Sequence, residues 1–294
     1  MRSALDKRVT DQAEGLRRLL ARNISRVVAV TGGPIGVGCT SAVVNLAAAL
    51  AGLGKDVLVI DERLGPNSVA SMLSSVRSGD SLNALLAGEV SLDAVAPRLE
   101  LGFRVLAASR EHCADHSAAQ LGVMLSGPSD VVLIDARLDR KGALSPLAAQ
   151  AHDVMVVTRV AAQAITEAYA CMKRLHYEHA IAQFRVLINH VSNLADAHTT
   201  FENLAEVAGR YLSVSIAHAG CVASDPLMRR SLELGRCVVD AFPSANAARD
   251  YRHVAAEMLY WPLRATLTPR GSSLVGAGVP ASVRAEAPPT HQHA

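Results

Sequence analysis

A glycine-rich loop is the segment of this sequence best suited to chemistry. Residues 27–41 read VVAVTGGPIGVGCTS, so a β-branched run leads into glycines and then into a helical pattern. The backbone N–H groups of such a loop, with the N-terminus of the following helix, form a cradle for anions. We expect the cofactor-binding residues here to be Gly33, Gly36, Gly38, Cys39, Thr40 and Ser41.

One interpretation of this loop is a nucleotide-binding P-loop. Residues 33–40 fit GxxxxGK[ST] at both framing glycines and at Thr40, whose hydroxyl would hold Mg²⁺. Cys39 replaces the lysine that reaches the β- and γ-phosphates, which removes a charge-assisted contact worth about 1.5–3 kcal/mol. Pro34 also removes one N–H group from the cradle. The sequence therefore predicts a P-loop with a weakened hold on phosphate.

A second interpretation is the TGxxxGxG loop of short-chain dehydrogenases. Residues 31–38 fit that motif, and Tyr169 and Lys173 fit the catalytic YxxxK pair of that class. This alternative predicts hydride transfer with a nicotinamide cofactor. It lacks both an NNAG-like segment and a suitably placed serine before Tyr169.

Short apolar runs alternate with helical patterns along the chain. The strand candidates are Val27–Thr31, Val57–Ile60, Val105–Ala107, Val131–Ile134, Val154–Thr158 and Arg185–Ile188. The helix candidates are Ser41–Leu53, Ser117–Leu125, Ala162–Leu175, Thr199–Tyr211 and Ala247–Leu259. Continuous apolar strands alternating with helices predict an α/β fold with a doubly wound, mostly parallel sheet and helices on both faces.

Composition narrows the function classes. With 294 residues and 50% hydrophobic side chains, the chain can bury one large α/β core. A net charge of +2 and 3% aromatic residues argue against a direct nucleic-acid partner. No apolar stretch reaches the ~18 residues of a spanning helix, and the charged start of the chain does not resemble a secretory signal. We therefore expect a cytoplasmic protein, at most peripheral at the cell pole or inner membrane.

Several further segments carry a family resemblance. They are DQAEGLR at 11–17, KDVLVID at 55–61, DVVLID at 130–135, VVTRVAAQAITEAYACMK at 156–173, VLIN at 186–189 and DPLMRR at 225–230. This series resembles the MinD/ParA-like P-loop ATPases and, within them, the flagellar-number regulators of the FlhG/FleN (YlxH) type. The resemblance implies a MinD-like P-loop NTPase fold, a Mg²⁺ site at Thr40, Asp61 and Asp135, and an adenine contact from Asn189.

The chain departs from the family where the chemistry would occur. Pro34 and Cys39 replace the two loop lysines, and Arg63 replaces the aspartate that orients the attacking water. Phosphoryl transfer depends on positioning and charge neutralisation, so we assign no catalytic residue and expect a pseudo-ATPase. ATP and Mg²⁺ would bind weakly and neither would be essential. The first alternative is an active ATPase with a deviant P-loop, in which Arg63 and Arg137 supply the missing charge.

The resemblance also implies protein partners. Its N-terminal element contacts a FlhF-like, signal-recognition-type GTPase, with Gln12 as the principal contact. The partner-binding residues are then Asp11, Gln12, Ala13, Leu16 and Arg17. A flagellar transcription activator, a basal-body component and a second copy of the chain are further expected partners. The implied function is regulation of flagellar number or placement.

Three regions follow from these patterns. We expect residues 1–25 to form a helical partner-binding element and residues 26–264 to form the MinD-like domain. Residues 265–294 are expected to be a disordered Pro/Ala-rich tail. The last helical pattern, Ala247–Leu259, precedes Trp261 and Arg264, a pairing that also suits a membrane interface. We favour a buried helix that covers the sheet, with membrane contact as the weaker alternative.

Overall fold

The computed structural model describes residues 25–263, apart from 34–35, 64, 66 and 74–81. The predicted partner-binding element at Asp11–Arg17 and the predicted tail at 265–294 lie outside the described residues. Pro34 and Arg264 lie outside them as well. The three predicted regions therefore stay predictions.

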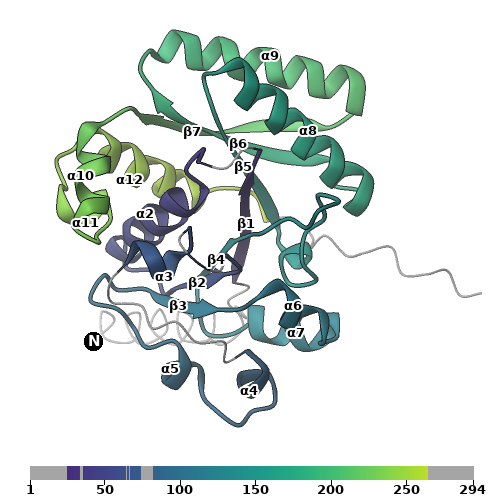
Figure 1. Ribbon diagram of the computed structural model, residues 1–294, viewed down its shortest axis with the longest axis vertical. Coiled ribbons are helices and arrows are strands. Elements are labelled where there is room, and N and C mark those ends of the chain that lie inside the picture. Colours follow the sequence, from purple (N-terminus) through teal and green to yellow (C-terminus); the bar gives the residue numbers. More distant parts are fainter. Residues whose placement is uncertain (1–24, 34–35, 64, 66, 74–81, 264–294) are drawn as a thin grey trace, which may run out of the picture.

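A single seven-stranded sheet organises the described chain, with neighbouring strands parallel and the order β3-β2-β4-β1-β5-β6-β7 (Figure 1). The strands are β1 Arg26–Gly32, β2 Val57–Asp61, β3 Arg104–Ala107, β4 Val131–Asp135, β5 Asp153–Arg159, β6 Gln183–Val191 and β7 Ser215–Ala223. The doubly wound α/β prediction and the six predicted strands are confirmed. The seventh strand, β7, was not predicted.

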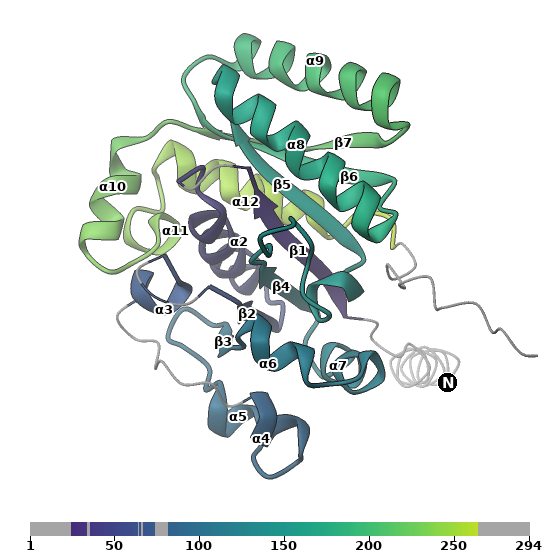
Figure 2. The same cartoon turned by 45° about the vertical axis from the view of Figure 1, so that its right-hand side comes forward.

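Helices cover both faces of the sheet (Figure 2). They are α2 Cys39–Gly52, α3 Val69–Met72, α4 Leu82–Leu86, α5 Leu92–Val95, α6 Arg110–Ala114, α7 Ala118–Leu125, α8 Ala162–His179, α9 Leu194–Leu212, α10 Pro226–Glu233, α11 Val238–Ala241 and α12 Asn246–Met258, with a 3₁₀ turn at Ala148–Gln150. Helices α2, α3, α11 and α12 contribute to the hydrophobic cluster on one face. Helices α4, α7, α8 and α9 contribute to the cluster on the other.

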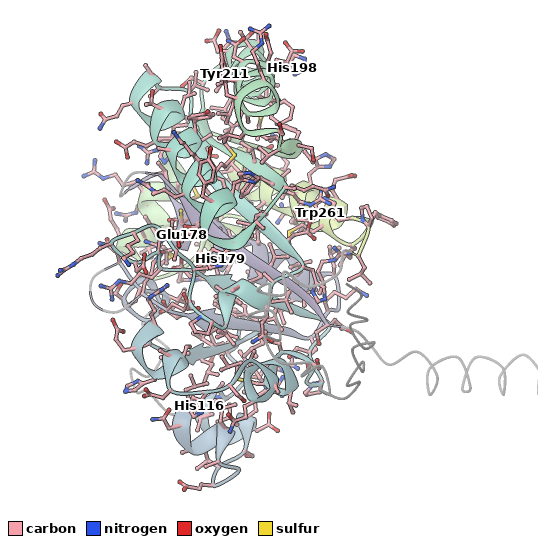
Figure 3. All side chains as sticks on the ribbon, turned by 90° about the vertical axis from the view of Figure 1, so that its right-hand side faces the viewer. His116, Glu178, His179, His198, Tyr211 and Trp261 are labelled. Carbon is pink, nitrogen blue, oxygen red and sulfur yellow. The ribbon has the colours of Figure 1, made fainter. Side chains whose placement is uncertain are left out.

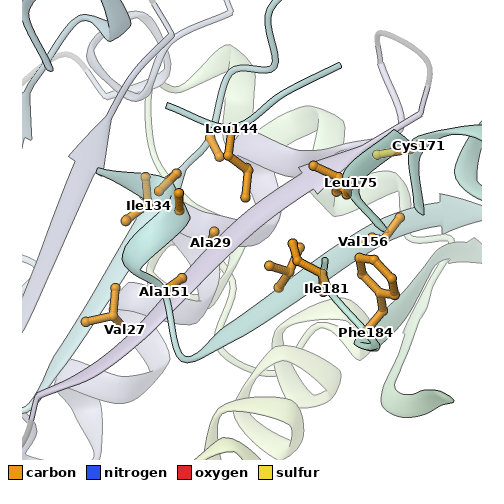
Figure 4. Close-up of a cluster of buried hydrophobic side chains, with 14 of the residues drawn as sticks. Val27, Ala29, Ile134, Leu144, Ala151, Val156, Cys171, Leu175, Ile181 and Phe184 are labelled. Atoms are coloured by element: carbon orange, nitrogen blue, oxygen red, sulfur yellow. The ribbon is translucent and has the colours of Figure 1, made fainter. Parts of the chain in front are cut away.

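The alternation of side chains along each strand feeds these two clusters. In β1, Val27 and Ala29 face the cluster with α8, whereas Val28 and Val30 face the cluster with α2. Figure 4 shows part of the first cluster, in which Ala29 of the central strand lies among apolar side chains of neighbouring elements. Both faces of β1 are therefore buried. Because the strand is held from both sides, the loop that follows it starts from a fixed position.

A charged clasp ties the end of the last helix to the amino edge of the sheet. Asp153 accepts from Arg26 at 3.3 Å and from Arg185 at 2.9 Å, and its side chain is fully buried. The Arg185 guanidinium stacks 3.8 Å from the centroid of Trp261, and Arg26 also donates to the Trp261 carbonyl. Trp261, labelled in Figure 3, is 9% exposed. The predicted buried helix at Ala247–Leu259 is confirmed as α12.

The strand order overturns the dehydrogenase alternative. In the dinucleotide-binding order 3-2-1-4-5-6 the first two strands are neighbours, whereas here β4 lies between β1 and β2. Tyr169 packs against the hydrophobic core from α8, and Lys173 is exposed. The YxxxK spacing is thus one turn of a packed helix. Among the described residues, no helix is long and apolar enough to cross a membrane.

Candidate functional site

The glycine loop lies at the carboxyl edge of the sheet, between β1 and α2. At this point β1 has β4 on one side and β5 on the other, so chain connections diverge in opposite directions. Ligands of open α/β sheets bind at such switch points. Gly36 and Gly38 adopt φ of 88° and 99°, which glycine tolerates without strain. Gly38 precedes α2 with no side-chain cap, so the first turn of α2 is suited to an anion.

Asn189, for which the resemblance implied an adenine contact, reaches this loop from the end of β6. Its Nδ2 donates to the carbonyl of Val37 at 2.9 Å, and its Oδ1 accepts from the His190 N–H at 2.9 Å. A Cβ atom on Gly38 would come within 2.3 Å of the same Nδ2. Asn189 therefore fixes the backbone of the loop and requires glycine at position 38. On the opposite side, a Cβ on Gly33 would meet the α8 backbone at Glu167.

Asp135 is the buried acid at the end of β4. Its Oδ2 accepts from the Thr40 hydroxyl at 2.6 Å, and its Oδ1 accepts from Arg63 Nε at 2.8 Å. Arg63 also donates to the Ala136 carbonyl at 3.1 Å. Burial raises the pKa of Asp135, and the charge of Arg63 with the hydroxyl of Thr40 opposes that rise. Both carboxylate oxygens thus have donors from this chain.

Asp61, the second expected metal ligand, pairs in register with Asp135 across β2 and β4. Its carboxylate accepts from the N–H groups of Arg63 at 3.0 Å, Val69 at 2.7 Å and Ala70 at 3.3 Å. Burial, with the nearby charge of Asp135, raises its pKa to about 6. Asp61 therefore holds the start of α3, and both of its carboxylate oxygens accept backbone N–H groups.

Cys39 cannot replace the charge of the missing lysine. The residue is 8% exposed, and a Cβ on Gly32 would lie 2.8 Å from its sulfur, so the thiol packs against the end of β1. Burial raises the pKa of this thiol to about 12. The first residue of α2 is thus a neutral, buried cysteine, where the P-loop motif has a lysine.

Two functional candidates escaped the sequence interpretation. Arg159, at the end of β5, donates through its guanidinium to the Gly36 carbonyl, and its buried Nε has no hydrogen-bond partner among the described residues. Glu62 is fully buried and accepts from the Ser145 hydroxyl and, at 3.1 Å, from the Arg137 N–H. Burial raises the pKa of Glu62 to about 7. Arg159 is the last residue of β5 and Glu62 directly follows β2, so both lie at the same carboxyl edge of the sheet as Asp61 and Asp135.

The structure brings most of the predicted site together. The loop glycines, Thr40, Asp61, Asp135 and Asn189 gather at one edge of the sheet, whereas Ser41 offers its carbonyl to Asn45 within α2. Arg137 is exposed and contributes its backbone to Glu62. Within the described ranges, no group of three His, Cys, Asp or Glu side chains is arranged to hold a metal ion.

Comparison with known proteins agrees with this geometry. The chain is 32% identical over 254 residues to the antiactivator FleN of Pseudomonas aeruginosa, covering 84% of this chain and 90% of that protein. It is 26% identical over 218 residues to the flagellum site-determining protein YlxH of Helicobacter pylori, covering 70% of this chain and 72% of that protein. No family model matches the chain.

Solved structures give the same fold. MinD of Pyrococcus horikoshii complexed with Mg-ADP superposes with a TM-score of 0.62 at 18% identity, over 80% of this chain and 96% of that chain. A chain of the MinC:MinD cell division protein complex of Aquifex aeolicus superposes with a TM-score of 0.63 at 21% identity, over 82% of this chain and 100% of that chain. With the FleN identity extending over most of both sequences, the chain belongs to the MinD/ParA-like flagellar-number regulators of the FleN type.

Proposed function

We propose that this chain regulates flagellar number or placement through protein contacts, and that its ATP hydrolysis is weak or lost. The relatives named antiactivator and flagellum site-determining protein support the regulatory part. One observation carries the loss of hydrolysis: Arg63 forms an ion pair with Asp135. The carboxylate that the resemblance assigns to Mg²⁺ thus already faces a positive charge.

The candidate site fits ATP at one end only. The positive-φ glycines and the first turn of α2 suit phosphate, and MinD of Pyrococcus horikoshii was solved with Mg-ADP. At the metal end, Thr40 donates to Asp135 and Asp61 accepts three backbone N–H groups, so Mg²⁺ would have to displace contacts within the chain. Weak nucleotide binding without turnover follows, and neither ATP nor Mg²⁺ is essential.

A second candidate function, an active ATPase with a deviant loop, is favoured by Arg159. Its guanidinium already contacts the loop at Gly36, and arginine binds phosphate well. In this alternative, Arg159 replaces the charge that Cys39 lacks. The ion pair between Arg63 and Asp135 must then open whenever Mg-ATP binds.

The partner-binding part of the proposal rests on the N-terminal element. Its residues Asp11–Arg17 would contact a FlhF-like, signal-recognition-type GTPase and stimulate it through Gln12. A flagellar transcription activator, a basal-body component and a second copy of the chain are proposed as further partners. Action in the cytoplasm, at most peripheral at the pole or inner membrane, is part of the same proposal.

Two assays of the full chain test the proposal. Phosphate release from Mg-ATP should stay at or close to the level of a protein-free blank, and the rate of GTP hydrolysis by a FlhF-like GTPase should rise when the chain is added. Gln12→Ala should abolish that rise, whereas Arg18→Ala, on the other side of the predicted helix, should retain it. Vigorous ATP turnover by the unmodified chain would establish the alternative, and undiminished stimulation by Gln12→Ala would refute the role of Gln12.

A further inference from the structure

An open apolar groove lies at the amino edge of the sheet, away from the glycine loop. Helices α4, α5 and α7 form it, and its volume is about 340 Å³. The groove is lined by Leu85, Leu86, Leu92, Val123, Met124 and Pro128, with Gln120 and Gly127 at its edge. Val123 is 76% exposed there. A solvent-open groove lined by such side chains has the chemistry that accepts the apolar face of an amphipathic helix.

The start of the described chain touches the wall of this groove. The Ser25 hydroxyl donates to the Ser129 carbonyl at 2.6 Å, and the Gly127 carbonyl lies 3.2 Å from the same oxygen. Gly127 and Pro128 are themselves groove residues. Residues 1–24 are therefore tethered beside the groove with no intervening linker, which gives them a high effective concentration there.

The sequence of that tethered segment suits an apolar groove. Leu5, Val9, Leu16 and Leu20 recur at helical spacing, and Leu19 and Ile24 widen the same stripe. Charged residues such as Lys7, Asp11, Glu14, Arg18 and Arg22 fall on the other side. A helix over residues 5–24 would be about 30 Å long and would offer a continuous apolar face.

Other segments outside the described residues suit the groove less well. Residues 74–81 read SSVRSGDS, with a single apolar side chain. The segment 264–294 contains Pro269, Pro280, Pro288 and Pro289 and has no apolar stripe at helical spacing. Neither could cover a groove lined by leucine, valine and methionine.

We propose that residues 5–24 dock in this groove as an amphipathic helix and that docking covers Gln12. Gln12 is seven residues after Leu5 and four before Leu16, so it lies on the stripe that faces the groove. Docking on its own domain and contact with the GTPase then exclude each other. The groove therefore competes with the GTPase for the N-terminal segment. This competition, unlike the docking itself, rests on the proposed function of Gln12.

Hydrogen exchange of the full chain, without nucleotide or partner, tests the docking. Amides of residues 9–22 should exchange at least about tenfold more slowly than in a synthetic peptide of residues 1–24. Val123→Asp, which places a charge in the groove, and Leu20→Asp, which places one on the stripe, should each remove that protection. Leu194→Asp is the matched control, because Leu194 is 73% exposed at the start of α9 and should leave the protection intact.

Each contrary outcome overturns the docking. The contrary outcomes are that residues 9–22 exchange as fast as in the free peptide, that their protection survives Val123→Asp, or that the protected segment is 264–294 instead. Protection that rises with protein concentration would assign the groove to a second copy. A separate titration with the GTPase tests the competition: Val123→Asp should bind at least about fivefold more tightly than the unmodified chain. Because the exchange experiment contains no GTPase, failure of the proposed function leaves its result interpretable.

Discussion

Arg63 and Asp135 form an ion pair at 2.8 Å across the ends of β2 and β4, with the Asp135 side chain fully buried and the Arg63 side chain 27% exposed. The arginine follows β2 by two residues, and the Asp61 carboxylate accepts its backbone N–H. A cation of the chain thus lies against the acid expected to ligate Mg²⁺. The resemblance implied that Arg63 stands where the family has an aspartate. The structure adds that Arg63 forms an ion pair with another carboxylate, that of Asp135.

Removal of the Arg63 guanidinium should show whether it competes with Mg²⁺ for Asp135. Arg63→Ala leaves Asp135 buried without its cation, which we expect to cost about 1–3 kcal/mol, because breaking a buried pair costs more than breaking an exposed one. Added Mg²⁺ should then raise the melting temperature of the variant and leave that of the unmodified chain unchanged. Arg98→Ala, which removes an exposed pair with Asp56, is the control. An equal Mg²⁺ effect on the unmodified chain would contradict this account.

Restoring the loop lysine alone should not restore turnover. In Cys39→Lys, the ion pair between Arg63 and Asp135 persists, and no carboxylate stands at position 63 to orient water. Phosphate release should therefore remain at background in Cys39→Lys and increase only in the double variant Cys39→Lys with Arg63→Asp. Family-like turnover from the single variant would show that the loop cation is the only missing group.

The pH dependence of stability should reflect Glu62. Its pKa is about 7 in the folded protein against an ordinary value of 4.5, because burial disfavours the charge. Between these values the folded protein holds a proton that the unfolded chain has released, so the free energy of unfolding falls as pH rises. The pKa of Asp61 is raised from 3.8 to about 6, so this group acts in the same direction over that lower range.

Glu62→Gln removes this titration. The variant should lose the downward slope between about pH 6 and 7, keep below pH 6 the part due to Asp61, and gain on the order of 1–3 kcal/mol at pH 8. Urea unfolding at several pH values measures the effect, and Glu111→Gln, on the exposed side of α6, should keep the original slope. A slope that is unchanged in Glu62→Gln would exclude Glu62 as its source.

The clasp at the amino edge should contribute strongly to stability. Asp153→Ala removes the carboxylate shared by Arg26 and Arg185, and we expect the free energy of unfolding to fall by about 3–5 kcal/mol. Trp261, the single tryptophan, reports unfolding by fluorescence. Asp93→Ala, whose side chain is 77% exposed in its pair with Arg104, should change stability by less than about 1 kcal/mol. Equal losses in the two variants would contradict the role of the clasp.

The main strands could be predicted because each is buried on both sides and reads as a continuous apolar run. The edge strand β7 could not, because Ser215, His218 and Gly220 interrupt its pattern and most of its residues are only partly buried. The short helices α3, α4, α5 and α6 have five residues or fewer, which is too few for a helical period. Their positions follow from packing and capping in the folded chain.

For the candidate site, the sequence predicts which residues lie at the same edge of the sheet. A parallel sheet places Asp61 and Asp135 at one edge with the glycine loop, and that juxtaposition is confirmed. The directions of the long side chains were not predictable. Arg63 turns to Asp135 and Arg159 to Gly36, and both depend on which acceptors the folded neighbours leave within reach.

The contacts of Ser25 with Gly127 and of Arg26 with the Trp261 carbonyl place the start and the end of the described chain at the same pole of the molecule. The glycine loop occupies the opposite pole. A protein captured by either terminal segment would leave the loop end sterically open. Both ends of the described chain therefore lie at the amino edge of the sheet, and the glycine loop lies free of them at the carboxyl edge.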